Sequence, residues 1–354
     1  MRLKSLDALR GLDMLFLCGL SAVCRGFCKL FPGGEEWAFY SQFAHVRWEG
    51  LHFEDLIFPF FIFIAGAAFP FSLARQVEKG MTSRAIHRKI LVRLVALVLL
   101  GYVYNGHLLG GNYGKFHWWS VLGIIGFAWA TAALCYVHFR MKARLAITVA
   151  LLAGYWTLLQ FTAPDAPSGA GAVSPAGNMM GYFKRQVCDY WILLSVVGYS
   201  SSAFFGMFAT DIVRKARAGL TSARKSGLLA ACGAFLLAAG LALEPTCPLV
   251  KNLWTPSYAL VCGGLSFLTF ALFYFLIDVK GISAWCFPLE VVGSNALVAY
   301  LLTSLVDFTR PSTRLFGWLA NLCPTPDFVI ACGQVLIVWT VLWYLHRNRT
   351  FLKV

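Results

Sequence analysis

The sequence predicts an all-α, polytopic membrane protein with about ten transmembrane helices and both termini in the cytoplasm. Of its 354 residues, 59% are hydrophobic and 13% are charged, and the mean hydropathy is +0.68. A spanning helix needs about 20 mostly apolar residues, so a chain of this length with short loops has room for about ten. This composition leaves no stretch for a soluble domain, and we expect residues 1–354 to form a single transmembrane domain.

Apolar segments alternate with short polar connections along the whole chain. Ten of them are long enough to span a membrane, at about residues 9–30, 54–74, 90–105, 118–138, 144–163, 190–210, 227–244, 257–277, 286–306 and 328–346. Asp7 precedes the first segment and Asp13 lies in it, and no small-x-small cleavage site follows. We therefore interpret this segment as a retained helix and not as a signal peptide. An even number of spans places both termini on one side of the membrane.

The basic residues predict which side that is. Twenty-one of the 30 Lys and Arg residues fall at the termini or in connections on the N-terminal side. Because cytoplasmic loops concentrate Lys and Arg near helix ends, we expect both termini in the cytoplasm. The same bias explains the net charge of +14 without a nucleic-acid partner, since the cations form no long tail and no patch interleaved with aromatic residues.

The eleven cysteines indicate no metal site. None belongs to a Cys-x-x-Cys motif, and most lie inside apolar segments, where a free Cys behaves as a small hydrophobe. No disulfide framework is predicted either. Cys188, Cys247 and Cys323 lie near loops of the expected outer face, so a disulfide between two of them stays an open alternative.

A polar segment that runs directly into the second span is the main candidate for chemistry. It contains His45, and the span begins with Glu54 and Asp55. If the loop folds back, the Asp55 carboxylate can hold one ring nitrogen of His45 while the other faces a substrate, as a base and its orienting group do. His52, three residues before Asp55, is the rival partner. A lone His near a helix end is more often structural than catalytic, so a structural role for His45 stays open, although its position at a membrane edge raises the case for function.

Three charged residues recur every third position at the start of the first span. On a helix, Asp7, Arg10 and Asp13 would form adjacent i,i+3 pairs. Charges that enter hydrocarbon are usually paired or functional. An ion-pair clasp to a neighbouring helix and a contact with a ligand are both compatible with this spacing.

A cationic run precedes the third span. Arg84, Arg88, Lys89 and Arg93 would lie at its expected cytoplasmic entry. Anionic lipid headgroups explain such a run and are the preferred interpretation. The functional alternative is binding of a phosphate-rich cosubstrate such as coenzyme A. No Walker loop or Gly-x-Gly-x-x-Gly motif after a strand is present, which argues against a nucleotide-hydrolysing pump.

Two expected outer loops carry features of interest. In Lys251–Tyr258, Asn252 and Trp254 are either interface residues or parts of a sugar site, in which an amide binds hydroxyls and a ring covers the apolar sugar face. The loop Pro164–Gly181 is rich in Pro, Gly, Ala and Ser and is expected to be a mobile linker, with a lid as the alternative.

Three residues inside the predicted spans affect helix packing. Pro59 frees backbone groups near the start of the second span, and Gly66 permits the close approach of another helix. Asn295 places an amide inside the ninth span, where we expect it to bond a neighbouring helix.

Several of these motifs occur together in a known family. They are, in chain order, Ser5-Leu-Asp7-Ala-Leu-Arg10-Gly11, His45-x-x-Trp48-x-Gly50, Asp55-Leu-x-Phe58-Pro59-x-Phe-x-Phe-Ile-x-Gly66, Lys251-Asn252-Leu-Trp254-x-x-Ser257-Tyr258, Asp278-Val-Lys280-Gly281 and Asn295. With this set the chain resembles the heparan-alpha-glucosaminide N-acetyltransferase family and its bacterial relatives. The resemblance covers most of the chain.

The resemblance implies an acyltransferase of the bacterial inner membrane that uses cytoplasmic acetyl-CoA as cosubstrate, without a metal. The acetyl group would pass to an amino sugar or glycan end on the far side. The resemblance also implies that His45 and Asp55 are catalytic. We expect Trp48, Asn252 and Trp254 to bind the acceptor. The expected partners are this acceptor, membrane lipids and, as an open alternative, a second copy of the chain. An O-acyltransferase of envelope polysaccharide and a sugar or lipid transporter are the rival functions, and the lack of an internal repeat weighs against the transporter.

Overall fold

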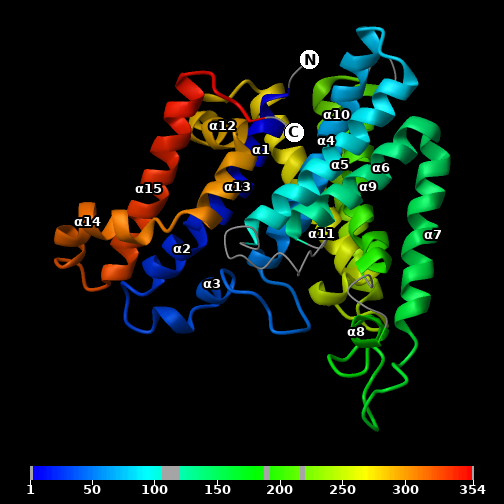
Figure 1. Cartoon of the computed structure of the whole chain (residues 1–354), viewed down its shortest axis with the longest axis horizontal. Helices are drawn as coiled ribbons and strands as arrows, with labels where there is room; N and C mark the ends of the chain where they lie inside the picture. The colour runs from blue at the N-terminus through cyan, green and yellow to red at the C-terminus, as the bar shows by residue number, and fades with distance from the viewer. Residues whose placement is uncertain (1–2, 106–119, 187–191, 216–219, 353–354) are drawn as a thin grey trace. The chain divides into compact units, whose positions relative to one another are not determined.

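The computed structural model describes residues 3–105, 120–186, 192–215 and 220–352 (Figure 1). The regular elements of these residues are helices, and the β pairing among them consists of the isolated bridges Glu49↔Val250 and Thr162↔Asn178. The α-helices are α1 (Lys4–Leu15), α2 (Ser21–Cys28), α3 (Ala38–Ser41), α4 (Phe53–Glu78), α5 (Ser83–Tyr104), α6 (Val121–His138), α7 (Met141–Leu159), α8 (Met179–Gln186), α9 (Ile192–Lys215), α10 (Ser222–Leu243), α11 (Pro256–Phe273), α12 (Phe287–Ser294), α13 (Ala296–Leu305), α14 (Thr309–Ala320) and α15 (Pro326–Arg347). The predicted all-α fold is confirmed.

The helices match the predicted spans one by one. Within the described residues, eight helical segments are long and apolar enough to cross a membrane, and a bent helix pair makes a ninth. The remaining predicted span, 90–105, is the third along the chain and lies in the 22-residue helix α5. Its last 18 residues contain three charged residues, Arg88, Lys89 and Arg93, whereas each of the eight other segments has an apolar window of that length with at most two. The chain is therefore a multi-pass membrane protein built from helices.

The chain divides into two compact units. The central unit contains Arg47–Leu51 and Ile62–Leu272, and the terminal unit contains Arg2–Val46, His52–Phe61 and Phe273–Val354. Helix α4 begins in the terminal unit and continues in the central unit. The predicted single transmembrane domain over residues 1–354 is not tested by this division and stays a prediction.

In the central unit, α4 and α9 approach each other at glycines. A Cβ atom at Gly66 would lie 2.1 Å from the carbonyl oxygen of Ala203, and one at Gly206 would lie 1.9 Å from that of Phe63. No side chain fits into such contacts, so the two backbones touch directly. The predicted packing role of Gly66 is confirmed.

A buried ion pair joins three helices of the same unit. Arg144 of α7 donates from Nη2 to Asp211 Oδ2 of α9 at 2.6 Å, and both side chains are almost fully buried. Tyr136 of α6 donates its hydroxyl to Asp211 Oδ1 at 2.8 Å. Because removing one partner would leave a buried charge, this cluster fixes the relative positions of α6, α7 and α9.

In the terminal unit, α1 and α12 also pack through glycines. A Cβ atom at Gly11 would lie 1.8 Å from the carbonyl oxygen of Leu289, and one at Gly293 would lie 2.2 Å from that of Asp7. After α1 the first span continues as a π-helical stretch, Phe16–Leu20, in which Gly19 has a φ of 118°. This conformation is accessible to glycine without strain, so the span can change course there and continue as α2.

The ninth span is broken at Asn295. The helical segments Ala284–Ser294 and Ala296–Leu305 are bent by 64° relative to each other. The Asn295 side chain donates to the carbonyl of Thr350 at 3.0 Å and accepts from the N–H of Leu352 at 3.3 Å. The expectation that this amide bonds a neighbouring helix is therefore wrong. Its partner is the backbone of the segment after α15, which binds both the NH₂ group and the oxygen of the amide.

Candidate active site

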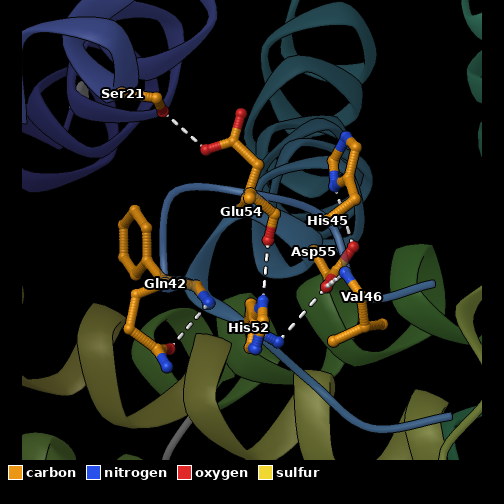
Figure 2. Close-up of polar contacts among 9 residues, drawn as sticks. Ser21, Gln42, His45, Val46, His52, Glu54 and Asp55 are labelled. Carbon is orange, nitrogen blue, oxygen red and sulfur yellow. Dashed lines mark hydrogen bonds and ion pairs between the residues drawn. The ribbon is translucent and has the colours of Figure 1, made fainter. Parts of the chain in front are cut away.

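The segment before α4 is held in place by a glutamine. Gln42 accepts the N–H of Phe53 on its side-chain oxygen at 3.1 Å and the N–H of Glu54 on its backbone carbonyl at 2.9 Å (Figure 2). Both N–H groups belong to the first turn of the helix, which has no intrahelical partners for them. The start of α4 is thereby tied to the polar segment that precedes it.

Asp55 is the centre of this arrangement. Its side chain has no exposed surface. Oδ2 accepts the backbone N–H groups of Val46 and His52 at 3.2 Å each, and Oδ1 lies 2.8 Å from Nδ1 of His45. Several donors to one carboxylate offset the cost of burying its charge. Asp55 therefore holds Val46 and His52, and it also holds the ring of His45.

The two histidines have different partners. The side chain of His45 is 59% exposed although its Nδ1 contacts the buried Asp55. His52 places its Nδ1 2.8 Å from the carbonyl oxygen of Ala44 and reaches Asp55 only through its backbone N–H. Asp55 thus contacts the ring of His45 and not that of His52, which answers the question left open by spacing. A proton from a substrate would go to Nε2 of His45, since Nδ1 faces the carboxylate.

A second carboxylate of the same turn was not singled out from the sequence. Glu54 is half-buried and accepts the hydroxyl of Ser21 of α2 on Oε2 at 2.5 Å (Figure 2). The contact joins residues 33 positions apart. The sequence shows only that Glu54 is an acidic residue next to Asp55. The contact with Ser21 could not be predicted, because hydropathy does not reveal which face of α2 meets α4.

The segment that follows His45 belongs to the central unit. The half-buried Trp48 donates its indole N–H to the carbonyl of Val173 at 2.9 Å. Glu49 pairs with Val250, and Gly50 donates its N–H to the carbonyl of Leu249 at 2.8 Å. The segment Trp48–Gly50 is therefore paired with the backbone that directly precedes Lys251–Tyr258.

The two predicted acceptor residues of the Lys251–Tyr258 segment differ in exposure. Asn252 is exposed. Trp254 is 1% exposed, and its ring centroid lies 4.2 Å from that of Tyr199 and 5.2 Å from that of Tyr258. Trp254 also has a φ of 51°, which is rare for a bulky residue and persists where packing enforces it. This packing gives Trp254 a structural role, and the predicted contacts of all three acceptor residues with a sugar stay predictions.

The cationic run is separated into two environments on α5. Arg84, Arg88 and Lys89 are exposed, and Arg84 and Arg88 lie one helical turn apart. Arg93 is instead placed over the ring of Trp129 of α6, 4.3 Å from its centroid. The first two guanidinium groups fit a phosphate best, whether of a cosubstrate or of a lipid headgroup.

The three charged residues of α1 do not act as one group. Arg10 pairs with Asp7 at 3.3 Å, whereas Asp13 is 2% exposed and its Oδ2 has no hydrogen-bond partner. Among the described residues, no three His, Cys, Asp or Glu side chains gather as metal ligands would. Cys247 and Cys323 are free thiols in that part of the chain, and Cys188 lies outside it.

Comparison with known proteins gives matches of two kinds. Residues 2–108 match a family described as a domain of unknown function, DUF5009. The whole chain is 23% identical over 419 aligned residues to the heparan-alpha-glucosaminide N-acetyltransferase of Homo sapiens and 22% identical to that of Mus musculus. The alignments cover 100% of this chain and 60% of each relative, so the chain spans about three fifths of their length. These matches confirm the resemblance stated from the motifs: over its whole length the chain is similar to the heparan-alpha-glucosaminide N-acetyltransferases.

Proposed function

We propose that this protein is a transmembrane acetyltransferase that moves the acetyl group of acetyl-CoA to the amine of an amino sugar or glycan end. The similarity over the full chain to two enzymes named as N-acetyltransferases supports the reaction class. The observation that carries the proposal is the contact between an exposed His45 and a buried Asp55. Acyl transfer needs a base of this kind, oriented by a carboxylate.

The chemistry follows from this pair. The neutral amine of the acceptor attacks the thioester carbonyl, and Nε2 of His45 takes the proton that the nitrogen loses. Asp55 stabilises the imidazolium that forms and keeps Nδ1 protonated before the reaction. The intermediate then expels the CoA thiolate, which receives the proton from His45, so that an amide and a thiol are released. A covalent route, in which the imidazole is acetylated first, uses the same residues.

The two substrates are expected to come from opposite sides of the membrane. From the bias of Lys and Arg we expect Arg84 and Arg88 on the cytoplasmic side, and we propose that they bind the phosphates of acetyl-CoA. Lys89 and Arg93 stay weaker candidates because one is adjacent to Met81 and the other stacks on Trp129. Anionic lipid headgroups remain the alternative ligand of all four cations.

The test is thiol release by the purified full-length protein in lipid nanodiscs, with acetyl-CoA and a panel of amino sugars and polysaccharide ends. We expect thiol release that depends on an amine acceptor, and a product that resists mild base as an amide does. His45→Ala should abolish it. The matched control is His138→Gln, which changes an exposed histidine at the end of α6.

Two outcomes would overturn the proposal. A base-labile ester as the sole product would identify an O-acyltransferase. Sugar uptake into vesicles without acetyl-CoA, together with no thiol release for any acceptor, would identify a transporter.

A further inference from the structure

Glu54 lies beside the candidate base but takes no part in holding it. It precedes Asp55 in the first turn of α4, and its backbone N–H is bound by Gln42. Figure 2 shows the side chains of Glu54 and His45 both extending away from His52, on the upper side of the view. The carboxylate of Glu54 thus belongs to the residue next to Asp55, which holds the imidazole.

The two neighbouring carboxylates, those of Glu54 and Asp55, differ in how many hydrogen-bond donors they receive. Asp55 receives two backbone N–H groups and the ring of His45, whereas Glu54 receives the single hydroxyl of Ser21 on Oε2. An ionised carboxylate can accept about four hydrogen bonds. Arg25 lies one turn beyond Ser21 on α2, and no ion pair joins it to Glu54 among the described residues. Glu54 thus retains acceptor capacity, and its negative charge is paired with no cation of the described residues.

We infer that Glu54, held by Ser21, is the group that recognises the amine of the acceptor in its protonated form. This inference rests on the proposed function and gives its acceptor a chemical class: a primary ammonium group on a sugar. An ammonium ion carries three N–H donors and no acceptor, which complements the unused oxygen sites of Glu54. A hydroxyl group in place of the ammonium carries no charge, so its hydrogen bond to the carboxylate is weaker. Glu54 would therefore select amines over alcohols.

Recognition and reaction then fall to different residues. Glu54 binds the ammonium ion and brings it to the exposed ring of His45. One N–H proton passes through Nε2 of His45 to solvent, which leaves the neutral amine whose lone pair attacks the acetyl carbon. The second proton that the nitrogen then loses passes through His45 to the departing CoA thiolate. Glu54 keeps its charge throughout and binds one of the remaining N–H bonds. It is a specificity residue and not the base.

The test compares amine and alcohol acceptors in Glu54→Gln, which keeps the shape of the side chain and removes its charge. We expect the KM for glucosamine to rise by about 10- to 100-fold, the ratio that corresponds to one charge-assisted hydrogen bond. The KM for acetyl-CoA should not change. The inhibition constant of glucose, which lacks the amine, should change by less than about threefold. Glu36→Gln, an exposed glutamate of the same unit, is the matched control and should behave as the wild type.

Ser21→Ala provides an independent check, because it removes the hydroxyl that holds Glu54 and should raise the KM for glucosamine less than Glu54→Gln does. If the wild type acetylates amines and Glu54→Gln keeps the wild-type KM for glucosamine, this inference is wrong and the proposed function stands. An equal rise in the constants for glucosamine and glucose would also overturn it, since that would show a structural effect. If the wild type acetylates no amine, the proposed function itself fails.

Discussion

Asp55→Asn isolates the orienting role of the carboxylate, because asparagine has the same shape. The amide has one oxygen where the carboxylate has two. In the native loop, Oδ2 accepts the N–H groups of Val46 and His52, and Oδ1 contacts Nδ1 of His45. The asparagine oxygen can accept from the two backbone N–H groups or from the ring of His45, but not from both.

The structure decides between the two orientations. Turning the NH₂ group toward Val46 and His52 would leave two backbone donors of the loop unsatisfied, at a cost of about 1–3 kcal/mol each. The oxygen therefore stays with the backbone, and the NH₂ group faces His45. Nδ1 must then accept a hydrogen bond, so the proton of the neutral ring moves to Nε2, where the base should be. The productive tautomer is disfavoured by about 2–6 kcal/mol, which corresponds to a loss of activity between about 30-fold and about 10⁴-fold.

The assay is the rate of thiol release with saturating acetyl-CoA and glucosamine, together with the melting temperature followed by tryptophan fluorescence. We expect a fall in kcat within the stated range, with a KM for acetyl-CoA and a melting temperature close to those of the wild type. Activity within threefold of the wild type would refute the reasoning, because the tautomer of His45 would then be irrelevant to turnover.

Further predictions concern packing and thiol reactivity. Gly11→Ala places a Cβ atom 1.8 Å from the carbonyl oxygen of Leu289, so it should lower the free energy of unfolding by about 1–3 kcal/mol as overpacked sites do. Gly154 is an exposed glycine of α7, and a Cβ atom added there has no atom within 4 Å. Gly154→Ala should therefore raise the free energy of unfolding by about 0.5–1 kcal/mol. Equal melting temperatures for the two variants would contradict the α1–α12 contact. Burial raises the pKa of the Cys247 thiol, so less of it is the reactive thiolate at any given pH. In an iodoacetamide time course at pH 8 read by mass spectrometry, Cys247 should react more slowly than the less buried Cys323, and the reverse order would show that the loop is open.

The spans were predictable because each depends on local composition. About 20 apolar residues between polar connections identify a membrane helix wherever it packs, and all ten predicted segments correspond to helices. The short helices α8 and α14 were not predicted. Each has 12 residues or fewer and a mixed composition, so neither stands out from a loop by hydropathy.

The candidate site was predictable where its residues are close in sequence. His45 and Asp55 are ten positions apart, and a short loop brings them together. The contacts that depend on distant packing were not predictable: Ser21 meets Glu54 across 33 positions, and Trp48 meets Val173 across 125. The break at Asn295 was missed for a related reason. Its partner is the chain beyond α15, and nothing near Asn295 in the sequence signals that contact.

Transfer across the membrane can be measured directly in sealed proteoliposomes. Glucosamine is enclosed in the lumen, ¹³C-acetyl-CoA is added outside, and the luminal sugar is analysed by mass spectrometry with wild-type protein and with His45→Ala. We predict labelled N-acetylglucosamine inside the vesicles with the wild type and none with the variant, while intact acetyl-CoA stays outside. Equal amounts of labelled product with the two proteins, or product only when both substrates are on the same side, would contradict transmembrane acetyl transfer through His45.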